Sequence, residues 1–166
     1  MGQQQLLLLV LATVIVGIAI AVGIIAFREN SVRSNFDAMT QDAIRIANDL
    51  QAWKQKPEMF GGSPDLTKTV AANMVGADFN RLGYLTFHGA GITCYNTRNA
   101  IFGMTPTAGG ATIEGLNMPN SNYVQIIVTG MADTDIINNI TAAVRGGKDN
   151  AGSDVTTVPT PAGCTL

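Results

Sequence analysis

The sequence is poor in the residues from which most active sites and metal sites are built. It has one histidine, His88, and two cysteines, Cys94 and Cys164, in 166 residues, and it contains no C-x-x-C-H motif. Zinc and haem sites made by a single chain need more imidazole or thiolate ligands than this. No activated nucleophile, paired carboxylates or phosphate-binding loop can be recognised either. The sequence therefore predicts no cofactor, no metal centre and no enzymatic activity.

Clustered positive charge is also missing. Ten Lys and Arg residues stand against twelve Asp and Glu, which gives a net charge of −2. Because phosphate binding needs clustered cations, no contact with nucleic acid is expected. The charges are unevenly distributed: residues 1–27 carry none, residues 28–56 carry five positive and four negative, and residues 57–166 carry five positive and eight negative.

The first of these segments holds a long apolar run, residues 6–27, in which the one polar side chain is Thr13. A helix of about 20 apolar residues spans a bilayer. A cleaved secretory signal fits less well, because its apolar core is about 7–15 residues long and a positively charged segment precedes it. We therefore interpret the apolar run as a membrane-length helix.

The helix is predicted to continue beyond the apolar run. Further apolar residues recur at alternating spacings of four and three, which is typical of one face of an amphipathic helix. This apolar stripe, predicted to pack against the rest of the domain, consists of Val32, Phe36, Met39, Ala43, Ile46, Leu50 and Trp53. The charged residues between them, from Glu29 to Lys54, are predicted to face solvent. No proline occurs before Pro57, so one helix is expected from about Gln3 to Lys56.

The rest of the chain is predicted to form a small β-rich domain. Ser63 and Pro64 indicate the start of a short second helix that reaches about Met74. Short β-rich segments bounded by Gly, Asn and Pro predict an antiparallel meander. These segments are residues 84–88, 92–95, 100–104, 112–114 and 123–129. The acidic residues 133–135 predict the start of a third helix that runs to about Val144.

The expected fold class is α+β, with a long N-terminal helix, first hydrophobic and then amphipathic, packed on a small antiparallel sheet. Three parts are predicted: a hydrophobic transmembrane or filament-core helix at 1–28, its amphipathic continuation at 29–56, and a globular head domain at 57–166.

This pattern, with a cysteine near the end of the domain, resembles the type IV pilin superfamily of bacterial pilins, secretion pseudopilins and archaeal pilus subunits. The resemblance covers residues 1 to about 56 by pattern and Cys164 by position. Precursors in that family are cut after a glycine that abuts the apolar run, and Gly2 followed by Gln3 looks like this junction. If Met1 is instead the first mature residue, Gln5 stands where bacterial pilins usually have glutamate. In neither register is that glutamate present.

The resemblance implies a homo-oligomer, a helical filament of identical subunits. The membrane would hold the subunit before assembly, and a prepilin peptidase and a pilus assembly machinery would be its partners. The filament would lie outside the cell, assembled from a precursor anchored in the cytoplasmic membrane. Its core would contain Leu6, Leu9, Val10, Val14, Val16, Ile20, Ile24 and Phe27.

Two other functions stay open. The chain could be a minor pseudopilin of a secretion system, which would share all these features. It could also be a single-pass membrane protein whose domain binds a ligand or a sugar, with the apolar stripe forming a parallel coiled coil. Arg28 and Arg33 follow the apolar run with no basic residue before it, which by the charge rule for membrane helices favours a cytoplasmic domain. The Thr-, Asn- and Gly-rich composition and the two cysteines favour an oxidising compartment.

Cys94 and Cys164 are expected to form a disulfide that closes a loop of about 70 residues, the alternative being two buried thiols. Other candidates have equally simple structural explanations. His88 is expected at a surface or strand edge, and residues 139–141 form a sequon for N-glycosylation. The acidic residues that could bind Ca²⁺, or instead cap a helix and line loops, are Asp133, Asp135, Asp149 and Asp154.

Overall fold

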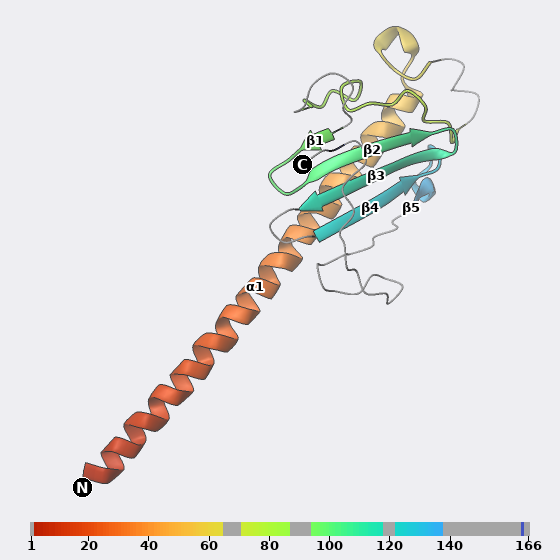
Figure 1. Ribbon diagram of the computed structural model, residues 1–166. Coiled ribbons are helices and arrows are strands. Elements are labelled where there is room, and N and C mark those ends of the chain that lie inside the picture. Colours follow the sequence, from red (N-terminus) through yellow and green to blue (C-terminus); the bar gives the residue numbers. More distant parts are fainter. Residues whose placement is uncertain (1, 65–70, 87–93, 118–121, 138–163, 165–166) are drawn as a thin grey trace. The chain divides into compact units, whose positions relative to one another are not determined.

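The computed structural model describes residues 2–64, 71–86, 94–117, 122–137 and Cys164. In chain order, its elements are α1 (Gly2–Gln55), the 3₁₀ turn η1 (Glu58–Phe60), β1 (Cys94–Asn96), β2 (Ile101–Thr107), β3 (Gly110–Asn117), β4 (Asn122–Val128), the 3₁₀ turn η2 (Asp133–Asp135) and β5 (Ile136–Ile137). The long helix and the small antiparallel sheet form an α+β arrangement, and the predicted fold class is confirmed (Figure 1).

The chain divides into two compact units, residues 1–34 and 35–166. Helix α1 contributes to both units, because its first part makes up the first unit and residues 35–55 belong to the second. From here on, we call the second unit, residues 35–166, the head. The first unit therefore ends at Ser34, a few residues after residue 28, where the sequence predicted the end of the hydrophobic part of the helix.

Helix α1 runs without interruption from Gly2 to Gln55, close to the bounds predicted from the absence of proline. Pro57 follows its end in an extended conformation, and a tight turn leads to Gly61, whose φ of 80° suits glycine. The indole N–H of Trp53 donates to the carbonyl of Gly61 at 3.0 Å. The turn is thereby fixed to the last turns of the helix.

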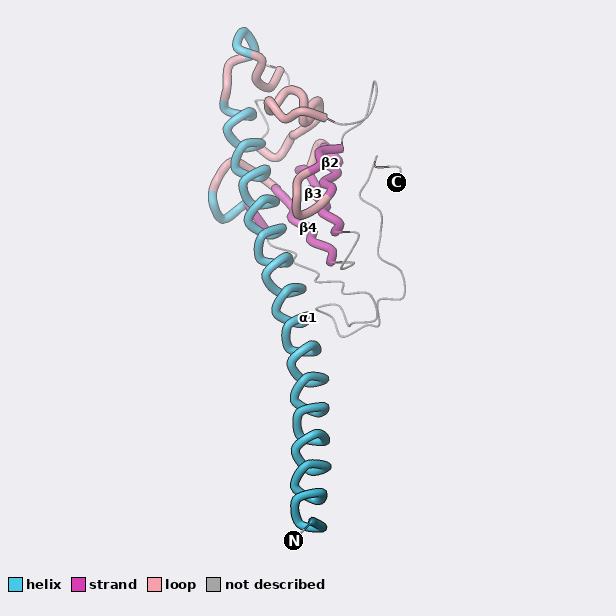
Figure 2. Tube along the Cα trace, turned by 90° about the vertical axis from the view of Figure 1, so that its left-hand side faces the viewer, coloured by secondary structure: helices cyan, strands magenta, loops and turns pink. Residues whose placement is uncertain are grey.

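The sheet is an antiparallel meander of five strands, in which each strand pairs with its neighbours in the chain. Side chains alternate between its two faces, and the register places Met104 opposite Ile113 and Ile113 opposite Ile126. Figure 2 views the sheet from the side and shows α1 along one of these faces. The buried strand residues of that face are Phe102, Met104, Ala111, Ile113, Val124, Ile126 and Val128.

In the part of the chain that the structure describes, the hydrophobic core of the head forms between this face and α1. Five residues of the apolar stripe lie in it and are at most 3% exposed: Met39, Ala43, Ile46, Leu50 and Trp53. Phe36 packs against the core half-buried, while Val32 belongs to the first unit. Burying each large apolar side chain contributes about 1.5–3 kcal/mol to folding, so the stripe is a major source of the stability of the head.

A glycine on β3 leaves room for a large side chain of this core. A Cβ atom at Gly115 would lie 2.5 Å from Cε1 of Phe102, whose ring is fully buried. Since real side chains do not approach so closely, the lack of a side chain at Gly115 leaves the space that the Phe102 ring fills.

Two predicted helices need correction. The expected second helix does not reach Met74, because residues 71 and 72 form a turn and residues 73 and 74 have no regular structure, while residues 65–70 lie outside the described residues. The expected third helix is wrong at its start, because Ile136 and Ile137 form β5 and pair with β4. Two consecutive isoleucines fit a short strand as well as a helix.

Two of the predicted strands are only partly described. Residues 84–86 of the first form no strand, residues 87–93 lie outside the described residues, and Cys94 and Tyr95 of the second lie in β1. The three following segments are strands that extend one to three residues beyond the predicted bounds at one or both ends. The ends of these strands depend on which residues pair across the sheet, and the sequence of one segment alone does not show that pairing.

We expect that a chain lacking residues 1–28 folds into a soluble monomer, because the described core of the head contains no residue before Phe36. Size-exclusion chromatography and a cooperative thermal transition would check this. A chain lacking residues 1–42 is the control, since it loses Phe36 and Met39 and should be much less stable. Aggregation or lack of structure in the first fragment would contradict the division into two units.

Candidate assembly surface

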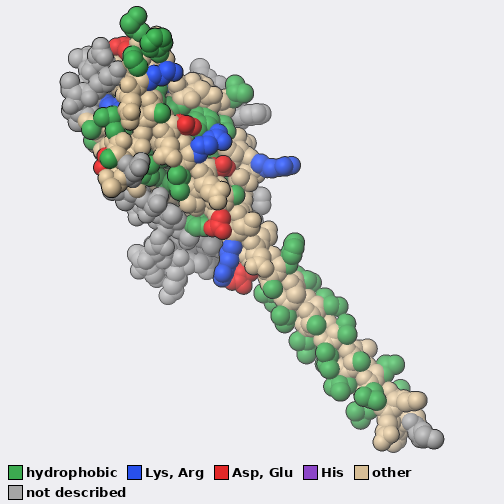
Figure 3. All heavy atoms as spheres, turned by 180° about the vertical axis from the view of Figure 1, so that it is seen from behind, with side chains coloured by type: hydrophobic (Ala, Val, Ile, Leu, Met, Phe, Trp, Pro, Cys, Tyr) green, Lys and Arg blue, Asp and Glu red, His purple; other side chains and the backbone are tan. Residues whose placement is uncertain are grey.

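The most unusual surface of the protein is the first part of α1. Every large apolar side chain in residues 6–27 is exposed, from 51% at Leu11 to 76% at Phe27. Figure 3 shows these side chains covering the visible side of the helix. Soluble proteins rarely leave so large a continuous apolar surface in water, so this part of α1 requires another apolar environment.

The eight residues predicted to form a filament core are all exposed on this helix. Exposure does not distinguish them from their neighbours, because residues on every side of the helix are exposed to a similar degree. The others, which the prediction did not include, are Leu7, Leu8, Leu11, Ile15, Ile18, Val22 and Ile25. The helix is thus apolar all round and could be surrounded by partners on all sides.

The polar side chain within the apolar run is satisfied by the helix itself. The Thr13 hydroxyl donates to the carbonyl of Val10 at 2.8 Å. Backbone groups inside a helix are also paired, so residues 6–27 present no unmet hydrogen-bonding group to an apolar surrounding. The run is therefore suited to lipid or to contact with other apolar helices.

Polar residues bound the run on both sides. Gly2 and Gln3, the proposed processing junction, lie in the first turn of α1. After the run, Arg33 donates to Glu29 at 2.9 Å across one helical turn, and both side chains are well exposed. Such an exposed pair contributes little to stability. Within the described residues, α1 is the helix long and apolar enough to cross a membrane.

In the head, two polar residues of α1 are buried, which the sequence pattern did not indicate. Gln51 donates from its amide nitrogen to the carbonyls of Gly130 at 3.1 Å and Ala132 at 3.0 Å. Lys54, predicted to face solvent, is only 1% exposed, and its ammonium group donates to the carbonyl of Asn73. Both residues tie the helix to loops that connect the elements of the head.

A network of amide side chains joins α1 to the end of the sheet where β3 ends and β2 and β4 begin. Asn35 donates to the carbonyl of Asn99 at 3.3 Å and accepts from Asn122 at 3.2 Å. Asn99 in turn donates to Asp42 at 3.1 Å, and Asn117 donates to the same carbonyl of Asn99 at 2.6 Å. The network begins at the first residue of the head and fixes where the helix meets the sheet.

A second polar cluster lies further along α1. The Tyr84 hydroxyl donates to Oδ2 of Asp49, and the guanidinium of Arg45 lies 5.5 Å from the centre of the Tyr84 ring. Burial and the hydrogen bond to Asp49 raise the pKa of Tyr84 to about 12, and the hydrogen bond with Tyr84 raises the pKa of Arg45. The Tyr84 ring also packs against Tyr95, with centroids 4.6 Å apart. The cluster holds a loop without regular structure against the helix.

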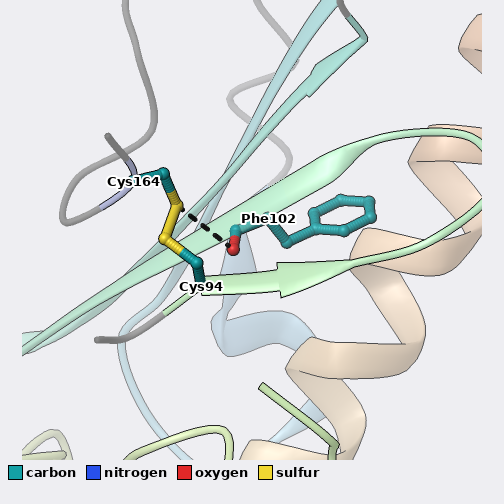
Figure 4. The surroundings of a disulfide bond; sticks show 3 residues. All are labelled: Cys94, Phe102 and Cys164. Atoms are coloured by element: carbon teal, nitrogen blue, oxygen red, sulfur yellow. Dashed lines mark hydrogen bonds between the residues drawn. A yellow bond between two sulfur atoms is a disulfide. The ribbon is translucent and has the colours of Figure 1, made fainter. Parts of the chain in front are cut away.

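The predicted disulfide between Cys94 and Cys164 is present, with the two Cα atoms 5.6 Å apart. Figure 4 shows the bond beside the backbone of β2, on the opposite side from the ring of Phe102. The Cys164 sulfur lies 3.7 Å from the Phe102 carbonyl oxygen. Since a disulfide sulfur carries no hydrogen, this is a packing contact. The bond connects the first strand of the sheet to the end of the chain.

The remaining candidates are only partly covered by the structure. Asp135 accepts from the backbone N–H of Ala132 at 3.0 Å and so closes the turn before β5. His88, the sequon at 139–141, Asp149 and Asp154 lie outside the described residues. In the part of the chain that is described, no three His, Cys, Asp or Glu residues come together as a metal site would require.

Comparison with known proteins gives no assignment: no family model, no curated protein and no solved structure matches the chain.

We expect the disulfide to be complete in the native protein and to stabilise the head by about 4 kcal/mol, the value of the chain-entropy relation for a loop of this length. Thiol alkylation of the unreduced protein, followed by mass spectrometry, should label neither cysteine. Unfolding in urea should show a lower free energy for the variant with Cys94→Ser and Cys164→Ser. Labelling of either cysteine without reduction would contradict the pairing.

We also expect the head to lose stability at alkaline pH through Tyr84. Its pKa rises from 10.0 to about 12, so the folded state favours the protonated phenol. The resulting stabilisation is complete below pH 10 and disappears as the pH rises through 12, a loss of about 1–2 kcal/mol for a partly screened group. Urea unfolding across this range should show a smaller loss for Tyr84→Phe than for the unmodified chain. An identical pH dependence would contradict the assignment.

Proposed function

We propose that this protein is the structural subunit of an extracellular type IV pilus-like filament, and that it polymerises through the apolar part of α1. One observation carries the proposal: a helix that is apolar on all sides, and exposed throughout residues 6–27, is joined to a folded head with its own core.

The physical basis is that this part of α1 needs an apolar environment at every stage. Before assembly, lipid supplies it, because the run is long enough to span a bilayer. In a filament, the same surface contacts identical helices, and lipid contacts are exchanged for protein contacts. The self-satisfied hydroxyl of Thr13 lets this exchange take place without leaving an unpaired polar group.

The head supports the same proposal. The described core of the head contains no side chain from residues 1–34. The heads can therefore coat a filament while the apolar helices associate with one another. The disulfide fits an oxidising compartment, which suits a subunit whose head lies outside the cell. Export, cleavage at Gly2 by a prepilin peptidase, and assembly by a pilus machinery belong to this proposal.

The coiled-coil form of the alternative function is disfavoured by the packing of the head. A coiled coil would need the apolar stripe, but its residues from Met39 to Trp53 are already buried against the sheet of the same chain. A membrane-anchored binding domain without a coiled coil stays a candidate, as does a minor pseudopilin. A filament shears mechanically from cells, whereas an anchored monomer needs detergent, and a pseudopilin would be scarce.

The test is electron microscopy of material sheared from cells, with mass spectrometry of the N-terminus of the subunit. Filaments that contain this chain as the main component are expected. A mature chain that begins at Gln3 would establish cleavage after Gly2. If the chain is recovered only from detergent extracts and no filament is seen, the proposal is wrong.

We expect Val14→Asp to abolish filaments and leave the head folded. The charge would be buried among neighbouring helices, and because residues 1–27 carry no cationic side chain to pair with it, the cost is several kcal/mol in every subunit. Filaments in sheared fractions are counted by electron microscopy, and the variant must first be found in the membrane fraction.

Two variants serve as controls for this prediction. Val14→Thr has the same shape, and its hydroxyl can bond the carbonyl one turn earlier as Thr13 does, so filaments should persist. Met39→Asp should instead unfold the head, since Met39 is fully buried in its core. Normal filaments from Val14→Asp would contradict assembly through the apolar run.

A further inference from the structure

A pocket of about 220 Å³ lies on the head where the last turns of α1 meet the loop that precedes Tyr84. It is lined by Asp49, Ala52, Trp53, Lys56, Arg81 and Leu82. Sites for drug-sized ligands usually have about 300–1,000 Å³, so this pocket is of a size to receive one small polar unit. None of its residues belongs to the apolar run or to the disulfide.

Two positive charges at the pocket have no partner within the described residues. Neither Lys56 nor Arg81 forms an ion pair or a side-chain hydrogen bond there, and both side chains are exposed. Their charges are not cancelled by Asp49 alone, so the pocket carries a net positive charge. Two such cations, one of them a guanidinium that matches a carboxylate in shape, favour a ligand with a carboxylate group.

Asp49 adds a second kind of recognition. Its Oδ2 atom accepts the Tyr84 hydroxyl, which holds the carboxylate in place. Within the described residues its Oδ1 atom has no hydrogen bond, and a fixed carboxylate oxygen is a strong acceptor for a ligand hydroxyl. Ala52, Leu82 and Trp53, which also line the pocket, supply apolar surface beside these charged groups.

We propose that this pocket binds a hexuronate, a sugar ring that carries a carboxylate. Lys56 and Arg81 bind the carboxylate of the sugar, Asp49 accepts one of its hydroxyl groups, and the apolar side chains contact the carbon–hydrogen face of the ring. The head would thus bind acidic polysaccharides through single uronate units. The inference does not depend on the filament, because all the residues involved belong to one head.

The sole tryptophan of the chain, Trp53, lines the pocket and so provides a direct readout. D-glucuronate is titrated into the full-length chain in detergent micelles, and the fluorescence of Trp53 is followed. We expect saturable binding of D-glucuronate and at least about tenfold weaker binding of D-glucose, which lacks the carboxylate, and of acetate, which lacks the hydroxyl groups.

Variants complete the test. Lys56→Gln and Arg81→Gln should each weaken binding about tenfold, the effect of losing one charge-assisted hydrogen bond. Arg98→Gln removes an exposed cation from the turn between β1 and β2, outside the pocket, and should leave the affinity unchanged. Both pocket residues are exposed, and an unchanged melting temperature would confirm that their variants fold.

Some results would overturn the proposal. No saturable response to D-glucuronate, or equal affinities for the unmodified chain and Arg81→Gln, would show that the pocket is not a uronate site. Acetate binding as tightly as D-glucuronate would show a site for simple anions with no recognition of the sugar. An equal loss of affinity in Arg98→Gln would reveal a general effect of net charge.

Discussion

The packing of the apolar stripe on the sheet is the interaction on which the rest of the structure depends. Met39, Ile46 and Leu50 lie fully buried against strands whose own buried residues come from β2, β3 and β4. Neither element would be stable alone, since a small sheet needs a partner for its apolar face and a lone helix is marginal in water. Because the stripe is already buried within one chain, the longest continuous apolar surface that the described residues leave for association between chains is the run at 6–27.

Buried polar groups give that packing a single register. The Gln51 amide reaches two loop carbonyls and the Lys54 ammonium reaches a third, so a shift of the helix by one turn would leave these groups without partners in the interior. Apolar contacts alone tolerate such shifts better, because they are not directional. The amide network around Asn99 restrains the other end of the contact in the same way.

The elements that the sequence predicts correctly are those with a strong local signal. The length of α1 follows from the absence of proline before Pro57, and the stripe follows from its 4-3 spacing, whose middle and end lie in the core. The buried Lys54 could not be predicted, because a lysine at the end of a helix normally faces solvent and its carbonyl acceptor lies in a distant loop. The pocket could not be predicted from the sequence for a similar reason. Asp49 and Arg81 come together only in the folded chain, and their spacing in the sequence matches no motif. Ile136 and Ile137 form too short an apolar segment to distinguish strand from helix.

The disulfide also determines how the head would respond to mechanical force. Cys164 lies two residues from the end of the sequence and is bonded to β1, an edge strand of the sheet, 70 positions earlier. Tension applied to the C-terminal end therefore reaches the fold through β1 and bypasses β2 to β5. The residues between the two cysteines cannot be extended while the bond is intact. The length that the chain gains on forced unfolding is therefore smaller by about 240 Å. A protein built in this way yields to force at its helix and the following loop before it can lengthen through its sheet.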